Sequence, residues 1–321
     1  MQHAAVTLMA ACSFILTKGI SMNFPRLLPK SLLLLLAVIA ITASATLSYA
    51  ETYSVNFTTP WREGQLFKAT VKASQKSRML ISQGTQVVQQ QVLEDTAATM
   101  EADAKALTFF PHGGIKKVAY TIRSLRVSRS SGPESDYLPA GTQIIVESIG
   151  TGVKSYIIDG KVATKEQKEV LKLVTATDEA NYNDQILFGT DKPVELSGTW
   201  QPDLEKLKTA IAKDVGEIPV STGTMKLEAI EGSGDKQVAV VSGNVSFSGF
   251  APPLPPGISP KAGSFTIVLD GRIPATRTGS KRVENMKVTA SFVGETKGPT
   301  GALIMLTVMA DMSNSTTLVF P

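Results

Sequence analysis

The sequence predicts an α+β fold, mainly an antiparallel β-sheet that is curved and half-barrel-like, with two helices packed on one face. Three observations lead to this. Several segments alternate apolar and polar residues and end in turn residues. Two other segments space their apolar residues as helices do. Behind an N-terminal leader, roughly 270 residues without cysteine are long enough to build one large core.

The leader occupies residues 22–50. Arg26 and Lys30 precede the apolar run 32–41, and small residues continue to Ala50. This order is typical of a signal peptide cleaved after Ala50, with a second fit after Ala45 and an uncleaved anchor as the alternative. We interpret residues 1–21 as an upstream extension, with Met22 as the start. Residues 51–321 are then expected to form a single β-rich domain that is secreted or periplasmic, with no transmembrane span after cleavage.

Charge and cysteine content exclude several classes of protein. Residues 1–50 carry three of the 32 basic residues and no acidic one, which leaves 29 basic against 28 acidic residues in the remaining chain. This near-neutral balance argues against a nucleic-acid partner. Cys12 is the only cysteine and lies ahead of the expected domain. We therefore expect no disulfide and no thiolate metal site there.

The strands follow from alternation with a period of two. The clearest case is Phe67, Ala69, Val71 and Ala73, and the same pattern returns at Val118/Tyr120/Ile122, Val241/Val245/Phe247, Phe265/Ile267/Leu269 and Met286/Val288/Ala290/Phe292. Asp159-Gly160 predicts a hairpin turn. A change of apolar parity between Ile122 and Leu125 predicts a bulge or a strand end. Because each strand has one polar face that water can reach, an antiparallel sheet is favoured over a parallel one.

Two segments are less regular. Residues 303–310 are apolar on both faces, which predicts a central strand covered on both sides or packed under helices. Residues 87–108 have a helix-like composition between strand-like ends, and we interpret them as strand.

The helices are predicted from capping and spacing. Thr164 and Gln167 fit a capping box ahead of a helix over 164–175. A second helix is expected over 203–215, after Pro202. Between them, residues 186–200 are expected to be irregular and anchored on the sheet by Trp200. The proline-rich residues 252–257 are expected to form a stiff surface loop, with a ligand motif for proline-reading domains as the alternative.

No motif indicates catalysis, a metal or a cofactor. His112 is the one histidine after the leader, and we interpret it as a turn residue because no nucleophile or orienting acid is signalled nearby. The acidic cluster Glu94, Asp95, Glu101 and Asp103 lacks the spacing of a calcium loop. The segment 150–155 lacks the Gly-Lys ending of a phosphate loop.

One basic run is the candidate binding surface. It consists of Lys116, Lys117, Arg123, Arg126 and Arg129, with no acidic residue between them. On a strand, these side chains would offer positive charge to anionic lipid headgroups or envelope polymers. The plainer interpretation is an ordinary solvated strand face.

Four segments occur in a fixed order along the chain: Tyr156-Ile157-Ile158-Asp159-Gly160-Lys161, the capped helix, residues 186–194 and Gly198-Thr199-Trp200. Together they resemble a group of exported bacterial proteins of planctomycete and verrucomicrobial type that has no known activity. The resemblance implies export and a β-rich fold, and it carries no catalytic residues over to this chain.

The first functional hypothesis is therefore a non-catalytic envelope or secreted protein that binds a ligand or partner, with lipid as a candidate, on the concave side of its sheet. An apolar cavity lined by Phe67, Val71, Phe265, Ile267 and Phe292 would support it. Such a sheet would resemble periplasmic lipoprotein carriers at the level of fold alone. The alternatives are a structural or adhesion protein and a hydrolase without a recognisable motif.

Overall fold

The structure is a computed structural model. It describes residues 51–58, 61–130, 132–150, 153–181, 183–215, 218–251, 257–276, 279–298 and 301–321, without the side chains of 212–215. Residues 51–321 form one compact unit. The expected extension 1–21, the signal peptide 22–50 and the proline-rich residues 252–256 lie outside the described residues.

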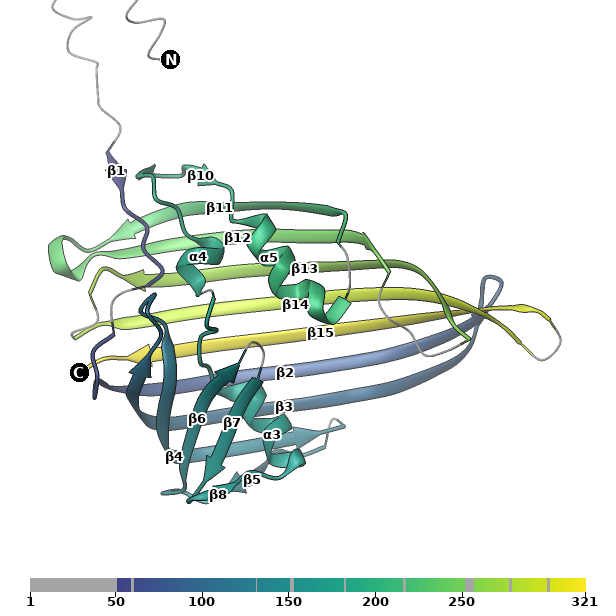
Figure 1. Ribbon diagram of the computed structural model, residues 1–321, viewed down its shortest axis with the longest axis horizontal. Coiled ribbons are helices and arrows are strands. Elements are labelled where there is room, and N and C mark those ends of the chain that lie inside the picture. The colour runs from purple at the N-terminus through teal and green to yellow at the C-terminus, as the bar shows by residue number, and fades with distance from the viewer. Residues whose placement is uncertain are drawn as a thin grey trace, which may run out of the picture. The chain divides into compact units, whose positions relative to one another are not determined.

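One antiparallel sheet of thirteen strands dominates the described part (Figure 1). Its strands are β2 (Leu66–Gln83), β3 (Gln86–Phe109), β4 (Ile115–Arg129), β5 (Ser135–Leu138), β6 (Gln143–Gly150), β7 (Val153–Ile158), β8 (Lys161–Val162), β10 (Thr199–Trp200), β11 (Val220–Glu231), β12 (Val238–Phe250), β13 (Ser259–Pro274), β14 (Lys281–Lys297) and β15 (Leu303–Val319). A two-stranded sheet pairs β1 (Thr52–Tyr53) with β9 (Val194–Glu195). The helices are α3 (Lys165–Val174), α4 (Asp184–Phe188), α5 (Leu204–Val215) and a 3-10 turn at Gly234–Lys236.

The sheet consists of two meanders, and the one from the C-terminal half, β10 to β15, precedes the one from the N-terminal half, β2 to β8, in the strand order. Its strand order is β10-β11-β12-β13-β14-β15-β2-β3-β4-β6-β7-β8, with β5 beside β4, and its two ends do not pair with each other. The C-terminal strand β15 therefore pairs with the N-terminal strand β2 in the middle of the sheet. The expected α+β fold with an open, half-barrel-like antiparallel sheet is confirmed.

Both long helices pack on the same face of the sheet. Directly paired residues share a face, and one such row runs across the sheet through Met225, Gly243, Leu269, Met286, Asn314, Ala73, Ala98 and Val127. Helix α3 buries Val170 and Leu171 in a core with the β2 and β3 end of this row. Helix α5 buries Leu207 in a second core with the β11 end. We call this side the helix face, and the opposite side the bare face.

The helix starts follow the local sequence. Thr164 and Gln167 form the predicted capping box of α3. The irregular segment before Trp200 contains a short helix that the sequence did not predict, α4, capped by Asn183. Trp200 does anchor this segment, because its Nε1 donates a 2.7 Å hydrogen bond to the Phe188 carbonyl oxygen.

Most strand predictions are confirmed, including the strand interpretation of residues 87–108, which lie in β3. The parity change after Ile122 is a bulge opposite Glu101 and Ala102. Asp159 and Gly160 make the β7–β8 turn with positive φ angles. The expectation for residues 303–310 is half wrong. They do lie in a central strand, but they are not covered on both sides, and Leu303 is 49% exposed.

Candidate functional site

An apolar strip crosses the helix face beyond the two cores. In register, Val308 pairs with Phe292 and Met79, and Leu306 pairs with Gly294 and Ile81. We define the apolar strip as Met79 and Ile81 of β2, Phe265 of β13, Met286 and Phe292 of β14, and Ile304, Leu306, Val308 and Met312 of β15. The strip continues the helix face, because Met312 pairs with the buried core residue Val288.

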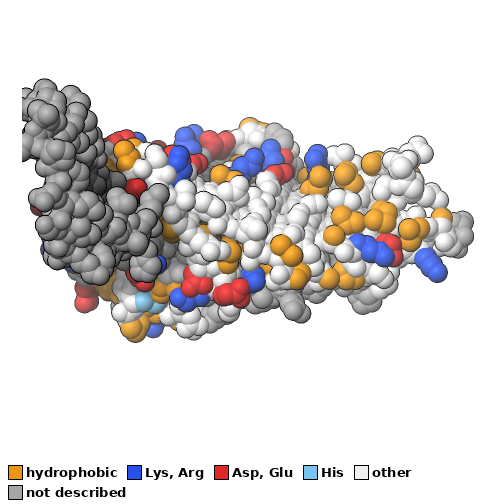
Figure 2. All heavy atoms as spheres, turned by 90° about the horizontal axis from the view of Figure 1, so that it is seen from above, with side chains coloured by type: hydrophobic (Ala, Val, Ile, Leu, Met, Phe, Trp, Pro, Cys, Tyr) orange, Lys and Arg blue, Asp and Glu red, His pale blue; other side chains and the backbone are white. Residues whose placement is uncertain are grey.

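The described helices leave this strip uncovered. The far ends of β2, β3, β14 and β15 extend past α3 and α5 (Figure 1). The strip side chains are half-buried or exposed, and Met286 and Met312 are each 40% exposed. Seen from above, hydrophobic side chains lie along the right of the molecule with charged ones beside them (Figure 2). Ala290 and Ala310 pair in the middle of the strip, so small residues form its floor.

The cavity expected from the sequence does not form as one space. Phe67 and Val71 are buried in the α3 core, and Ile267 is buried in the α5 core. Only Phe265 and Phe292 remain half-buried at the margin, where they contribute to the apolar strip. The reason is that α3 and α5 each cover part of the sheet, and the open apolar surface lies beyond them.

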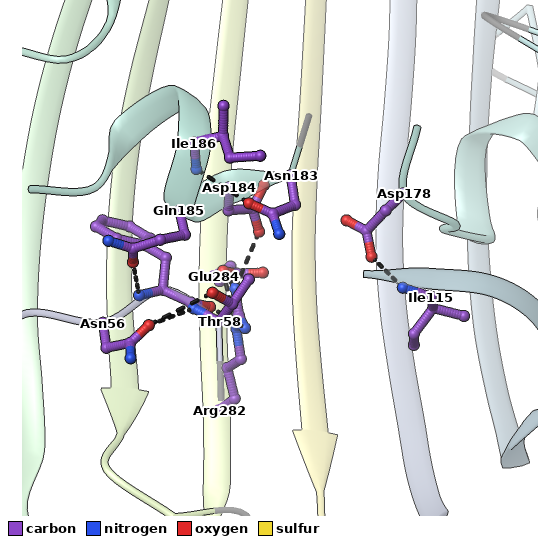
Figure 3. Close-up of polar contacts among 11 residues, drawn as sticks. Asn56, Thr58, Ile115, Asp178, Asn183, Asp184, Gln185, Ile186, Arg282 and Glu284 are labelled. Atoms are coloured by element: carbon purple, nitrogen blue, oxygen red, sulfur yellow. Dashed lines mark hydrogen bonds and ion pairs between the residues drawn. The ribbon is translucent and has the colours of Figure 1, made fainter. Parts of the chain in front are cut away.

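A buried arginine of β14 connects that strand to the segment at Phe57 and to α4, close to Met286 at one end of the strip (Figure 3). Arg282 of β14 is 7% exposed. Its Nη1 donates to the Phe57 carbonyl oxygen at 2.8 Å, and its Nη2 donates to Asp184 Oδ2 of α4 at 3.0 Å. Its Nε donates to Glu284 Oε1 at 2.9 Å. We call these residues the Arg282 latch.

The surroundings of the Arg282 latch raise the pKa of one of its carboxylates, Asp184. Burial by surrounding protein and the nearby charge of Glu284 raise the pKa of Asp184, while Arg282 opposes this. Because 47% of the Asp184 side chain is exposed, water moderates this rise in pKa. Burial also raises the pKa of Asp178, whose Oδ2 accepts a 2.5 Å hydrogen bond from the Ile115 backbone N–H. Asp184 and Glu284 thus both form ion pairs with the guanidinium of Arg282.

His112 lies in the β3–β4 turn, as expected, and its ring connects that turn to the segment before α4. Its Nε2 is 2.8 Å from the Glu179 carbonyl oxygen, to which it donates. Its Nδ1 is 3.1 Å from Asn183 Nδ2 and 3.2 Å from the Gly114 backbone nitrogen. Both ring nitrogens therefore make hydrogen bonds that fix loop geometry.

The bare face carries a hollow of about 550 Å³ that both polar and apolar residues line. Paired rows bring Lys72, Ser315, Asn285 and Asp270 to it from four strands. Neighbouring side chains bond to one another, as Ser315 Oγ donates to Asn285 Oδ1 at 2.7 Å. Polar groups thus line the hollow together with apolar residues such as Ala97 and Val268, whereas the strip on the other face is apolar.

The basic run predicted from the sequence lies on β4, where carboxylates accompany most of it. Lys117 pairs with Glu147 at 2.9 Å, Arg123 with Asp103 at 2.6 Å, Arg126 with Glu134 at 3.1 Å and Arg129 with Glu166 at 2.7 Å. Lys116 is half-buried. These carboxylates come from β3, β6, the loop before β5 and α3, so the sequence of β4 alone does not indicate them. They offset most of the positive charge that the run would present to an anionic surface.

No group of three or more His, Cys, Asp or Glu side chains among the described residues is placed to hold a metal ion. No described helix combines the length and apolarity needed to cross a membrane.

Comparison with known proteins leaves the family open. No protein-family profile matches the chain, and neither does any curated protein. OccK11 (OpdR) of Pseudomonas aeruginosa aligns over 83% of this chain and 100% of its own, with 8% identity and a TM-score of 0.16. MucB in complex with MucA(peri) aligns over 74% and 87%, with 6% identity and a TM-score of 0.12. Superpositions with TM-scores this low indicate neither a shared fold nor a shared function.

Proposed function

We propose that this chain is an exported, non-catalytic protein that binds an acyl chain of an amphipathic lipid along the apolar strip. The observation that supports this most is the strip itself, a run of apolar rows over β13, β14, β15 and β2. Exposed apolar surface of this kind on a folded protein marks an interaction site.

The dimensions and chemistry of the strip favour a lipid chain. From Met312 to Ile304 the strip follows β15 over eight steps between residues, about 27 Å at about 3.4 Å per step. One leaflet of a bilayer has an apolar depth of about 15 Å, half of the hydrocarbon core, so an acyl chain fits lengthwise. Methionine side chains adapt to flexible partners. The floor of Ala290 and Ala310 leaves room between larger neighbours.

A second candidate function is adhesion to a polar polymer through the hollow on the bare face. The observation favouring it is the row of hydroxyl, amide and charged groups at Ser315, Asn285, Lys72 and Asp270. We rank it second because neighbouring side chains there already satisfy part of one another's hydrogen bonds.

The lipid proposal is tested by Val308→Asp, with Met309→Asp as its matched control. The two residues are adjacent in β15, both half-buried, and face opposite sides of the sheet. The neutral probe N-phenyl-1-naphthylamine, which fluoresces in apolar surroundings, should bind the Val308→Asp protein at least about tenfold more weakly than wild type, because a carboxylate in the strip costs free energy to desolvate. Met309→Asp should change affinity less than about twofold. Equal loss in both variants, or in neither, would count against the strip.

A further inference from the structure

The outer part of β3 is a free sheet edge. Strand β4 pairs with β3 only from Thr96 to Phe109, and Ser130 donates a last 2.7 Å hydrogen bond to the Asp95 carbonyl oxygen. Residues 86–94 pair with β2 on one side, and no strand of the described chain pairs with them on the other side. Figure 1 shows β3 extending past the end of β4, with β2 on its other side.

This edge lacks the usual protection against pairing. Natural edge strands carry lysine, proline or other charges that discourage a second strand. Here residues 79–93 contain no charged residue and no proline. The exposed fractions of Val87, Val88, Val92 and Leu93 are 54%, 57%, 61% and 48%. Its protective features are two bulges, opposite the steps Ser77/Arg78 and Ile81/Ser82, and the carboxylates Glu94 and Asp95 at its inner end, beyond the uncharged stretch.

The sequence of this edge reads similarly in both directions from Gln90. Around Gln90, Gln89 matches Gln91, Val88 matches Val92, Val87 faces Leu93, and Gln86 faces Glu94. In an antiparallel pair of two copies with the twofold axis at Gln90, each of these residues therefore meets a chemically similar one. A self-complementary patch is what a twofold dimer requires, because both copies contribute the same surface.

We propose that two copies of this chain pair antiparallel through β3, with the twofold axis at Gln90. The edge N–H and C=O groups then find partners, and valine and leucine side chains pack across the junction. The glutamine amides near the axis can bond between the copies. The axis stands perpendicular to the sheet, so the helix faces of both copies lie on the same side. This inference does not depend on lipid binding.

Disulfide trapping tests the register. With Cys12→Ser as the background, Gln90→Cys places two thiols opposite each other, and their Cβ atoms lie about 4.5–5.5 Å apart as in a cross-strand pair, within reach of a disulfide after a small adjustment. Under mild oxidation this variant should form a covalent dimer at least tenfold faster than the matched control Val87→Cys. In the control the two thiols are six residues apart along the junction, about 20 Å.

Sedimentation equilibrium provides an independent readout. Gln90→Lys sets two ammonium groups against each other at the axis and should weaken the dimer at least tenfold. Thr85→Lys, at the hairpin tip, should not weaken it. Equal cross-linking of Gln90→Cys and Val87→Cys would overturn the register, and a monomer at every concentration would overturn the dimer. Assemblies that keep growing beyond two copies would overturn the closed twofold arrangement.

Discussion

Replacing Arg282 by methionine should lower the free energy of unfolding by about 3 kcal/mol. The change removes one cation from two carboxylates, Asp184 and Glu284, and leaves the Phe57 carbonyl oxygen without its donor. Breaking a buried ion pair from one side costs about 3–5 kcal/mol. We expect the lower end of that range because 47% of the Asp184 side chain and 27% of the Glu284 side chain remain exposed to water.

The matched control is Arg272→Met on the neighbouring strand β13. Arg272 pairs with Glu231, and the two side chains are 49% and 44% exposed. An exposed ion pair contributes about 0–1 kcal/mol, so this variant should unfold almost as wild type does in urea. If both variants lost the same stability, the Arg282 latch would be no more than a surface ion pair.

Phe57→Ala should cost about 3–4 kcal/mol, the expected loss for removing a buried aromatic ring. Phe57 is 1% exposed and lies in the α5 core. Its backbone N–H donates to Gln185 Oε1 at 2.7 Å, and its carbonyl oxygen accepts from Arg282. The ring therefore holds the first residues of the compact unit against the sheet.

Leu66→Ala is the control for Phe57→Ala, because Leu66 is 58% exposed and its truncation removes little buried surface. Urea unfolding followed by far-ultraviolet circular dichroism should separate the two variants clearly. Loss of less than 1 kcal/mol in Phe57→Ala would mean that this segment is dispensable for the core.

The strands and capped helices could be predicted because their signals are local. Alternation in Phe67–Ala73 reports directly which side chains face the core, and the Thr164 capping box needs only four residues. Helix α4 was missed because five residues are too few to display helical period. The β15–β2 pairing joins opposite ends of the chain, so neither strand alone reveals its partner.

The candidate site was harder to predict because it depends on what covers each strand. The apolar run 303–310 was recognised, but apolarity on both faces cannot distinguish a covered strand from an open one. The basic run on β4 was also recognised, while the carboxylates paired with it come from other elements. The Arg282 latch carries no sequence signal, since Phe57, Asp184 and Arg282 meet only through the fold.

The proposal that the apolar strip holds an acyl chain is tested most directly by native mass spectrometry of the protein purified without detergent, followed by solvent extraction. We expect wild type and Met309→Asp to carry an extractable molecule with one or more acyl chains at near one per protein chain. Val308→Asp, altered only on the helix face, should carry much less. Wild-type protein of bare polypeptide mass, with no acyl-containing molecule in the extract, would contradict the proposal.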